Sequence, residues 1–294
     1  MAKHSLKRDQ NENGPFFVDE SCINCGTCYW MAPHTFKDIE GQSAVYDQPE
    51  VDNKKEETIR AILSCPTFSI GNTQKGELDL KIEASLPFPL GDPEDHLFYT
   101  GYHSEKSFGA TSYFIQRETG NILVDSPRFL KKLALRFEKM GGLPFQYLTH
   151  QDDIGDTELY WKTFQGQRII HQEDAKRKDL EKYEILLQGK EAFSLAKDVL
   201  IIPVPGHTKG STVLLFKNKY LFTGDHLAYS KKNKHLIAFK NHCWYDFKEQ
   251  IQSMEKLLQF EFQYILPGHG APFHCSPSQM KKELKKCINW MKKN

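Results

Sequence analysis

The chain has 294 residues, a formal net charge of +1, 39% hydrophobic residues and 26% charged residues, which is typical of a folded globular protein of about two domains. This composition excludes an intrinsically disordered chain, a collagen and a coiled coil. The near balance of 39 basic and 38 acidic residues gives no electrostatic reason to expect nucleic-acid or membrane binding.

The cellular compartment follows from what the sequence lacks. No segment approaches the ~20 apolar residues of a transmembrane helix, and the first residues lack the apolar core of a signal peptide. We therefore expect a cytoplasmic protein. A chain of this length buries roughly three quarters of its unfolded surface and needs no disulfides to fold. In a reducing compartment, cysteines that cluster, as four of its seven do, are better explained as metal ligands or redox groups than as cross-links.

Composition divides the chain into three parts. Residues 1–75 contain four of the cysteines and are predicted to form a small first domain. Residues 76–94 are a polar passage with several prolines, interpreted as a linker, in which residues 77–84 alternate in polarity as a β-strand does. Long apolar segments follow, so residues 95–294 are predicted to be the second domain.

The first domain contains three cysteines with two residues between neighbours, Cys22, Cys25 and Cys28. Three thiolates on one short loop are soft ligands that converge locally, and the distant Cys65, which precedes a proline, is the candidate for a fourth. This spacing is typical of iron–sulfur clusters, whereas zinc ligands usually come in two pairs. A zinc site and free thiols are the alternatives.

Residues 15–75 resemble a single-cluster [4Fe-4S] ferredoxin in three segments, CINCGTCYWMAP, the helix-like EETIRAILS and CPTFSI. Two-cluster bacterial ferredoxins carry a fourth nearby cysteine before a proline. Ala32 occupies that position here, which fits one cluster. The resemblance implies a ferredoxin-like fold whose [4Fe-4S] cluster is held by the four cysteines named above.

The second domain alternates apolar β-like segments with amphipathic helices, which predicts an α/β or α+β fold. Residues 110–126 are predicted to form a β-hairpin. A helix should follow, with Ser126 as its N-cap, Pro127 as its first residue and Gly141 just past its end. The chain after residue 275 repeats the Ser-Pro start and predicts a C-terminal helix.

Three histidines and one aspartate of this domain each follow a strand-like apolar segment. They are His150 after FQYLT, His207 after VLIIPVPG, Asp225 after KYLFTG and His269 after FQYILPG. If these strands lie side by side, the four side chains meet at one sheet edge, where loops on a rigid scaffold form sites. Imidazole and carboxylate groups suit zinc, iron or manganese. His103, His171 and His235 lack this setting and are predicted to be surface histidines.

Residues 95–275 resemble the metallo-β-lactamase superfamily in the order of the motifs SYFI, NILVDS, LTH, PGHTKGS, TGD and PGHG. That superfamily folds as an αβ/βα sandwich with one or two metal ions in a groove at the sheet edge. The resemblance implies that His150, His207 and His269 are metal ligands. It also implies that Asp225 bridges the metals.

The first metal motif departs from the superfamily pattern T-H-x-H-x-D-H. The chain reads THQDDIG from Thr149, so Asp152 replaces the second histidine, and Ile154 and a glycine replace the aspartate and the last histidine. A first metal site then consists of His150, Asp152, His207 and Asp225.

A second metal site retains only His269 and Asp225, unless Asp153 or Asp156 joins it from a shifted turn. Carboxylates in place of histidines make the pocket harder and more anionic, which moves its preference from zinc toward iron or manganese. We therefore expect one or two divalent metal ions. The alternative is that the metal has been lost and the carboxylates only charge the start of the following helix.

A metal ion in this groove predicts hydrolysis of an ester, thioester, lactone or phosphodiester. The metal would lower the pKa of its water toward ~7 and polarise a carbonyl or phosphoryl oxygen. Asp152 or Asp156 would orient that water or receive the leaving proton. Because Ile154 stands where the superfamily has the aspartate that positions the nucleophile, turnover is expected to be slow or the substrate unusual.

An iron–sulfur cluster is an unusual companion for hydrolysis, so two alternatives stay open. One is a redox enzyme in which the ferredoxin domain feeds electrons to a non-haem metal in the groove. The other is a non-catalytic electron-transfer or sensor protein with a degenerate metal site. We expect a small-molecule substrate, anionic because basic and aromatic residues flank the groove, and a redox partner protein, but neither nucleic acid nor membrane.

Overall fold

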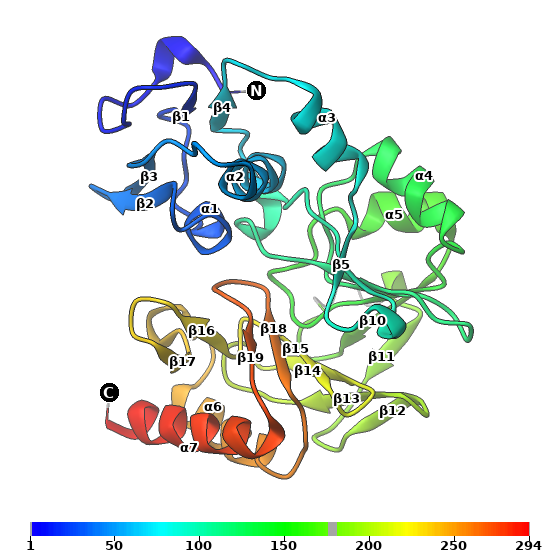
Figure 1. The fold of residues 1–294 in the computed structure, drawn as a ribbon. Helices are drawn as coiled ribbons and strands as arrows, with labels where there is room; N and C mark the ends of the chain where they lie inside the picture. Colours follow the sequence, from blue (N-terminus) through cyan, green and yellow to red (C-terminus); the bar gives the residue numbers. More distant parts are fainter. Residues whose placement is uncertain (1, 176–180, 294) are drawn as a thin grey trace.

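The computed structural model describes residues 2–175 and 181–293. A small N-terminal domain (blue in Figure 1) is followed by a sandwich of two β-sheets with helices on its outer faces. The predicted αβ/βα sandwich with a small preceding domain is confirmed. Among the described residues, no helix has both the length and the apolar character that crossing a bilayer requires.

The N-terminal domain consists of two small antiparallel sheets and two helices. Its elements are β1 (Phe16–Val18), α1 (Thr27–Met31), β2 (Phe36–Ile39), β3 (Gln42–Val45), α2 (Asp52–Ser64) and β4 (Ile70–Asn72). β1 pairs with β4, and β2 pairs with β3. The pairing of β1 with β4 brings the loop after β1, which holds three cysteines, next to the segment before β4, which holds Cys65.

Residues 77–84 form a helix, α3 (Glu77–Ala84), so the strand predicted from their alternation is wrong. The Gly76 N–H donates to the Asp79 carboxylate at 3.0 Å and closes the first turn. Leu78 and Ile82 lie one turn apart and pack on the core together. Glutamate, leucine, lysine and alanine are strong helix formers, so helix propensity and capping outweigh the alternating pattern.

The first sheet of the sandwich has the strand order β11-β10-β9-β8-β7-β6-β5. Its strands are β5 (Phe88–Leu90), β6 (Leu97–Tyr99), β7 (Tyr113–Ile115), β8 (Ile122–Val124), β9 (Phe145–Tyr147), β10 (Gln167–His171) and β11 (Ile185–Leu187). β7 and β8 form the predicted hairpin. β5 pairs with β6 although it lies in the predicted linker, and the proposed domain boundaries stay a prediction.

The second sheet has the strand order β12-β13-β14-β15-β18-β19. Its strands are β12 (Phe193–Ala196), β13 (Val199–Pro203), β14 (Thr212–Phe216), β15 (Tyr220–Gly224), β18 (Tyr264–Pro267) and β19 (Phe273–His274), and a separate hairpin contains β16 (Ala228–Ser230) and β17 (His235–Ile237). Successive residues point to opposite faces. Leu214 and Phe222 therefore join the core shared with the first sheet, while Val213 and Leu221 face the helices outside.

Two pairs of helices cover the sandwich (Figure 1). They are α4 (Lys131–Lys139) and α5 (Thr157–Phe164) on the first sheet, and α6 (Phe247–Leu257) and α7 (Pro277–Lys293) on the second. α7 begins at Pro277 as predicted.

The helix predicted from Pro127 starts later, at the first residue of α4. The backbone N–H of Arg128 donates to the Tyr102 carbonyl at 2.8 Å, and that of Phe129 donates to the Asp156 carboxylate at 2.8 Å. These contacts hold the two residues on neighbouring loops, and Leu130 is extended with a φ of −130° and a ψ of 129°, so the helix begins only at Lys131. The helix ends before Gly141, whose positive φ of 105° permits the turn, as predicted.

Candidate cluster site and metal centre

The four cysteines of the N-terminal domain line one cavity. Cys28 and Cys65 are buried, whereas Cys22 and Cys25 are partly exposed. Gly26 adopts left-handed backbone with a φ of 85° between Cys25 and the start of α1. Glycine takes this conformation without steric cost, so it allows the tight turn that places neighbouring cysteines around the same cavity.

Backbone N–H groups point at two of the sulfur atoms. The Asn24 N–H donates to Cys22 Sγ at 3.4 Å, and the Ser69 N–H donates to Cys65 Sγ at 3.3 Å. Hydrogen bonds of this kind to cluster sulfurs help to set the reduction potential of iron–sulfur proteins.

Burial raises the pKa of Cys25, Cys28 and Cys65 and so opposes their ionisation without a cation. It raises the pKa of Cys25 to about 11, and it raises the pKa of Cys28 well above the ordinary value although the Ser43 hydroxyl lies 3.0 Å from its sulfur. Buried thiolates therefore need a positively charged group among them. The four sulfurs around one cavity fit a [4Fe-4S] cluster.

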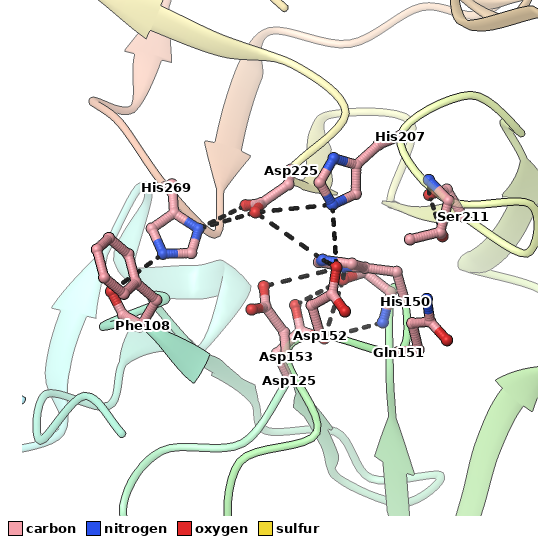
Figure 2. Close-up of polar contacts among 12 residues, drawn as sticks. Phe108, Asp125, His150, Gln151, Asp152, Asp153, His207, Ser211, Asp225 and His269 are labelled. Atoms are coloured by element: carbon pink, nitrogen blue, oxygen red, sulfur yellow. Dashed lines mark hydrogen bonds and ion pairs between the residues drawn. The ribbon is translucent and has the colours of Figure 1, made fainter. Parts of the chain in front are cut away.

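In the sandwich, four donors converge at the ends of strands from both sheets (Figure 2). His150 Nε2 lies 3.9 Å from both Asp152 Oδ2 and Asp225 Oδ2. His207 Nε2 lies 3.5 and 3.9 Å from the same two oxygens. These four distances approach the ~3.4 Å that separates the ligands of a tetrahedral metal ion with bonds of about 2.1 Å, and His150, Asp152 and His207 form one potential metal-binding group.

The hydrogen bonding and the pKa shifts of these donors are also consistent with a bound cation. The Nε2 atoms of His150 and His207 are buried and have no hydrogen-bond partner among the residues that the structure describes. A buried polar nitrogen without a partner lowers the stability of the fold by about 1–3 kcal/mol. A bound metal ion would give these nitrogens a partner and remove that cost. Burial lowers the pKa of His150 to about 4, which leaves the neutral imidazole that binds metals. The neighbouring His207 lowers the pKa of Asp152, which keeps that carboxylate ionised.

Asp153 offers a further carboxylate beside the same histidine. Its buried Oδ2 lies 3.9 Å from His150 Nδ1, and Asp153, His150 and Asp225 form a second potential metal-binding group. Burial and the nearby Asp225 raise the pKa of Asp153 well above its ordinary value. Both groups need His150, so the donors favour one ion over two separate ions.

His269 lies against Asp225 on the side away from His207 (Figure 2). Its Nδ1 is 2.7 and 2.9 Å from the two Asp225 oxygens, and its Nε2 is 3.3 Å from the Phe108 carbonyl oxygen. Burial lowers the pKa of His269, but the Asp225 carboxylate outweighs burial and raises it overall. Protein groups engage both ring nitrogens here, and metal ligation by His269 stays a prediction.

Asp156 has other partners. One of its oxygens pairs with Lys106 Nζ at 2.5 Å, and the other accepts the Phe129 N–H. Of the two predicted catalytic carboxylates, the structure brings Asp152, and not Asp156, into the group with His150 and His207.

Comparisons with known proteins address both domains. Residues 18–72 match the family described as the 4Fe-4S single cluster domain of Ferredoxin I, which confirms the ferredoxin-type domain. The DIM-1 metallo-β-lactamase superimposes with a TM-score of 0.52 at 17% identity, over 69% of this chain and 97% of its own. A metallo-β-lactamase from Pontibacter korlensis gives 0.52 at 15% identity, over 70% and 99% of the two chains.

The chain has the metallo-β-lactamase fold. At these identities the similarity establishes the fold and leaves the activity open. No curated protein is similar enough in sequence to match the chain.

The loops that carry His150 and His207 are held by buried carboxylates that sequence reasoning missed. Asp125, at the end of β8, accepts the Thr149 N–H at 2.8 Å and so fixes the residue before His150. Its place after a strand is the same signal that the four predicted residues show, and it was available in the sequence.

Asp174 joins the loops that carry His150 and His207. Its carboxylate accepts the Gln151 N–H at 3.1 Å, the Thr208 hydroxyl at 2.5 Å and the Gly210 N–H at 2.7 Å. Gln151 follows His150, and Thr208 follows His207. Nothing in the local sequence marks Asp174, because its partners come from two distant segments.

The prediction that His103 and His171 lie on the surface is wrong, because both are buried. His103 Nε2 lies 2.6 Å from the Tyr99 hydroxyl, and its Nδ1 lies 3.2 Å from the Thr27 hydroxyl. These partners satisfy a neutral ring, and burial lowers the pKa of His103 to about 3. His103 thus connects the metallo-β-lactamase fold to α1 of the cluster domain.

Proposed function

We propose that the groove binds one divalent metal ion through His150, His207, Asp152 and Asp225, and that the protein is a metal-dependent hydrolase. The convergence of these four donors carries the proposal. Two imidazoles with two carboxylates favour iron or manganese over zinc. The bound metal would lower the pKa of a water molecule and polarise the carbonyl or phosphoryl oxygen of an ester, thioester, lactone or phosphodiester.

Two carboxylates of the site have different surroundings, which suit them to different roles. Asp225 is held in place by its ion pair with His269. The Asp152 side chain is 43% exposed, in contrast to the two buried histidines. Because it is open to solvent and adjoins the two histidines, Asp152 would orient the attacking water.

Two side chains near the groove, Trp244 and Lys106, indicate which kind of substrate it could accept. The Trp244 side chain is 62% exposed and lies 6.4 Å from the His207 ring, measured between ring centroids. Lys106, expected to attract an anion, is paired with Asp156. We therefore propose a small organic substrate with an apolar part that rests on Trp244, and its negative charge stays a prediction.

Elemental analysis after anaerobic purification tests the metal site. We expect one groove metal beyond the cluster iron in the wild type, and loss of that metal in His150→Ala and His207→Ala with the acid-labile sulfide of the cluster unchanged. Hydrolysis of at least one substrate in an ester, thioester, lactone and phosphodiester panel should disappear with the metal. His235→Ala is the matched control, because His235 belongs to β17 and not to the converging group.

Retention of the groove metal in both histidine variants would contradict the assignment of the ligands. A wild type that takes up the metal but hydrolyses no substrate in the panel would contradict the hydrolase.

A further inference from the structure

The segment between β6 and β7, residues 100–112, touches the cluster site from one side. Gly109 lies so close to Cys25 that a Cβ built on it would be 3.0 Å from both Cβ and Sγ of the cysteine. The Thr27 hydroxyl donates to the Gly109 carbonyl at 3.3 Å. The backbone of Gly109 therefore lies beside a cluster ligand, with no room for a side chain between them.

The same segment touches the metal groove from its other side. The Phe108 carbonyl accepts a hydrogen bond from His269 Nε2 at 3.3 Å, and His269 Nδ1 contacts Asp225 at 2.7 Å. The Thr111 N–H donates to the Gly268 carbonyl at 2.7 Å, next to His269. Two consecutive residues, Phe108 and Gly109, thus link a cluster ligand to a metal ligand.

The link is also held rigidly. Tyr99 donates to Ser64 Oγ at 2.7 Å and contacts His103, which in turn contacts Thr27. These groups are all buried, and they join α2 and α1 of the cluster domain to the strand and loop that precede Phe108. A fixed distance between two centres suits electron transfer, because no domain movement has to precede it.

We propose that residues 108–109 form the route by which one electron passes from the reduced [4Fe-4S] cluster to an iron ion in the groove. The order along the route is Cys25, Gly109, the Phe108 carbonyl, His269 and Asp225. The proposal rests on the proposed function for the groove metal, and it requires iron, because zinc has no redox chemistry.

One electron moves and no bond is made or broken. The cluster goes from its reduced to its oxidised state as the groove iron goes from ferric to ferrous. The cluster regains the electron from a low-potential one-electron carrier, and dithionite replaces that carrier in the assay.

Electron paramagnetic resonance follows both centres in the full chain, loaded anaerobically with the cluster and with ferric iron in the groove. After mixing with dithionite in excess, samples are frozen at increasing times. At high dithionite we expect the ferric signal to decay at a rate that no longer depends on dithionite concentration, because the electron comes from the cluster of the same chain. A rate that stays proportional to dithionite, and that equals the rate in cluster-free Cys65→Ala, would overturn the proposal.

Two sets of variants test the route itself. His269→Phe keeps the ring but removes both nitrogens, and it should slow the ferric decay by roughly 10- to 100-fold, the scale for groups that orient metal ligands. Thr27→Val removes the hydroxyl that holds Gly109 and should also slow the decay, whereas Thr27→Ser retains the hydroxyl and the wild-type rate. The iron content and cluster potential of each variant are measured alongside.

If His269→Phe loses its groove iron, its decay rate cannot be measured. The comparison of Thr27→Val with Thr27→Ser then tests the route. An unchanged decay in Thr27→Val, at unchanged cluster potential, overturns the route. A groove that accepts zinc but not iron, with hydrolysis intact, overturns the electron transfer and leaves the hydrolase standing. A groove that binds no metal ion overturns both, and elemental analysis detects this before any rate is measured.

Discussion

At the scale of single residues, Asp174 determines how the loops of His150 and His207 lie relative to each other. Asp174→Asn replaces one acceptor oxygen with an NH₂ group that faces donors from those loops. We expect a loss of about 1–3 kcal/mol in the free energy of unfolding and roughly 10- to 100-fold weaker metal binding in the groove. Urea unfolding and metal titration measure the two effects.

Asp47→Asn is the control for Asp174→Asn. Asp47 is exposed and forms a 3.7 Å surface ion pair with Lys54, and such pairs contribute about 0–1 kcal/mol. The interpretation of Asp174 would be wrong if its variant bound metal as tightly as Asp47→Asn does.

The contrast between the predicted and the missed site residues has a physical basis. His150, His207, Asp225 and His269 follow apolar strands, and the ends of neighbouring strands meet in space, so a local pattern in the sequence predicted their proximity. Asp174 and His103 are partnered by residues far away in the chain, and no local pattern encodes such partners. Burial of His103 in particular depends on how the two domains pack.

At the scale of elements, a polar cluster connects the two sheets at the start of β15, the end of that strand away from Asp225. Asp95, just before β6, pairs with Lys217 at 2.7 Å and with Lys219 at 2.6 Å, and it accepts the Tyr220 hydroxyl at 2.8 Å. The three partners belong to the β14–β15 hairpin of the second sheet. Asp95 therefore fastens one sheet to the other.

We predict that Asp95→Asn destabilises the protein in a pH-dependent way. Burial would raise the pKa of Asp95, but its hydrogen bonds with Lys217 and Lys219 lower it to about 2, below the ~3.9 of an unfolded aspartate. The ionised form is thus favoured in the fold, so its stabilisation is complete above about pH 4 and is lost as the pH falls toward 2. With solvent screening allowed for, the variant should lose about 1–2 kcal/mol at pH 7.

Urea unfolding at pH 7 and at pH 3 measures this effect. The difference between wild type and Asp95→Asn should shrink at the lower pH. Asp92→Asn is the matched control, because Asp92 also pairs with Lys219 but its side chain is 60% exposed. A difference that grows on acidification would contradict the role given to Asp95.

Several elements were predicted from local signals, and the errors among them have identifiable causes. The hairpin of β7 and β8 and the start of α7 follow from turn and capping residues. The alternating pattern of α3 is also compatible with a helix, because Leu78 and Ile82 are four residues apart and lie on the same helical face. The late start of α4 depends on Tyr102 and Asp156, whose backbone and side-chain acceptors lie far away in the sequence.

At the scale of the whole molecule, the cluster domain is fixed to the sandwich by polar contacts near the cluster. The Arg128 guanidinium stacks on the Phe68 ring at 3.7 Å from its centroid and donates to the Pro66 carbonyl at 3.1 Å. Pro66 follows the cluster ligand Cys65. On another side, Lys231 donates to the Trp30 carbonyl at 2.6 Å. The packing of the domains therefore covers the segment that holds the fourth cysteine.

We predict that Arg128→Ala exposes the cluster without emptying the groove. The cation–π contact and the hydrogen bond together contribute about 1–2 kcal/mol, which corresponds to roughly 5- to 30-fold faster local opening. Loss of the visible cluster absorbance in the presence of an iron chelator should accelerate by that factor. Lys37→Ala is the control, because Lys37 stacks on Tyr46 within the cluster domain and should leave the rate unchanged. Equal rates in the two variants, or loss of the groove metal in Arg128→Ala, would show that the domain contact does not protect the cluster separately from the metal centre.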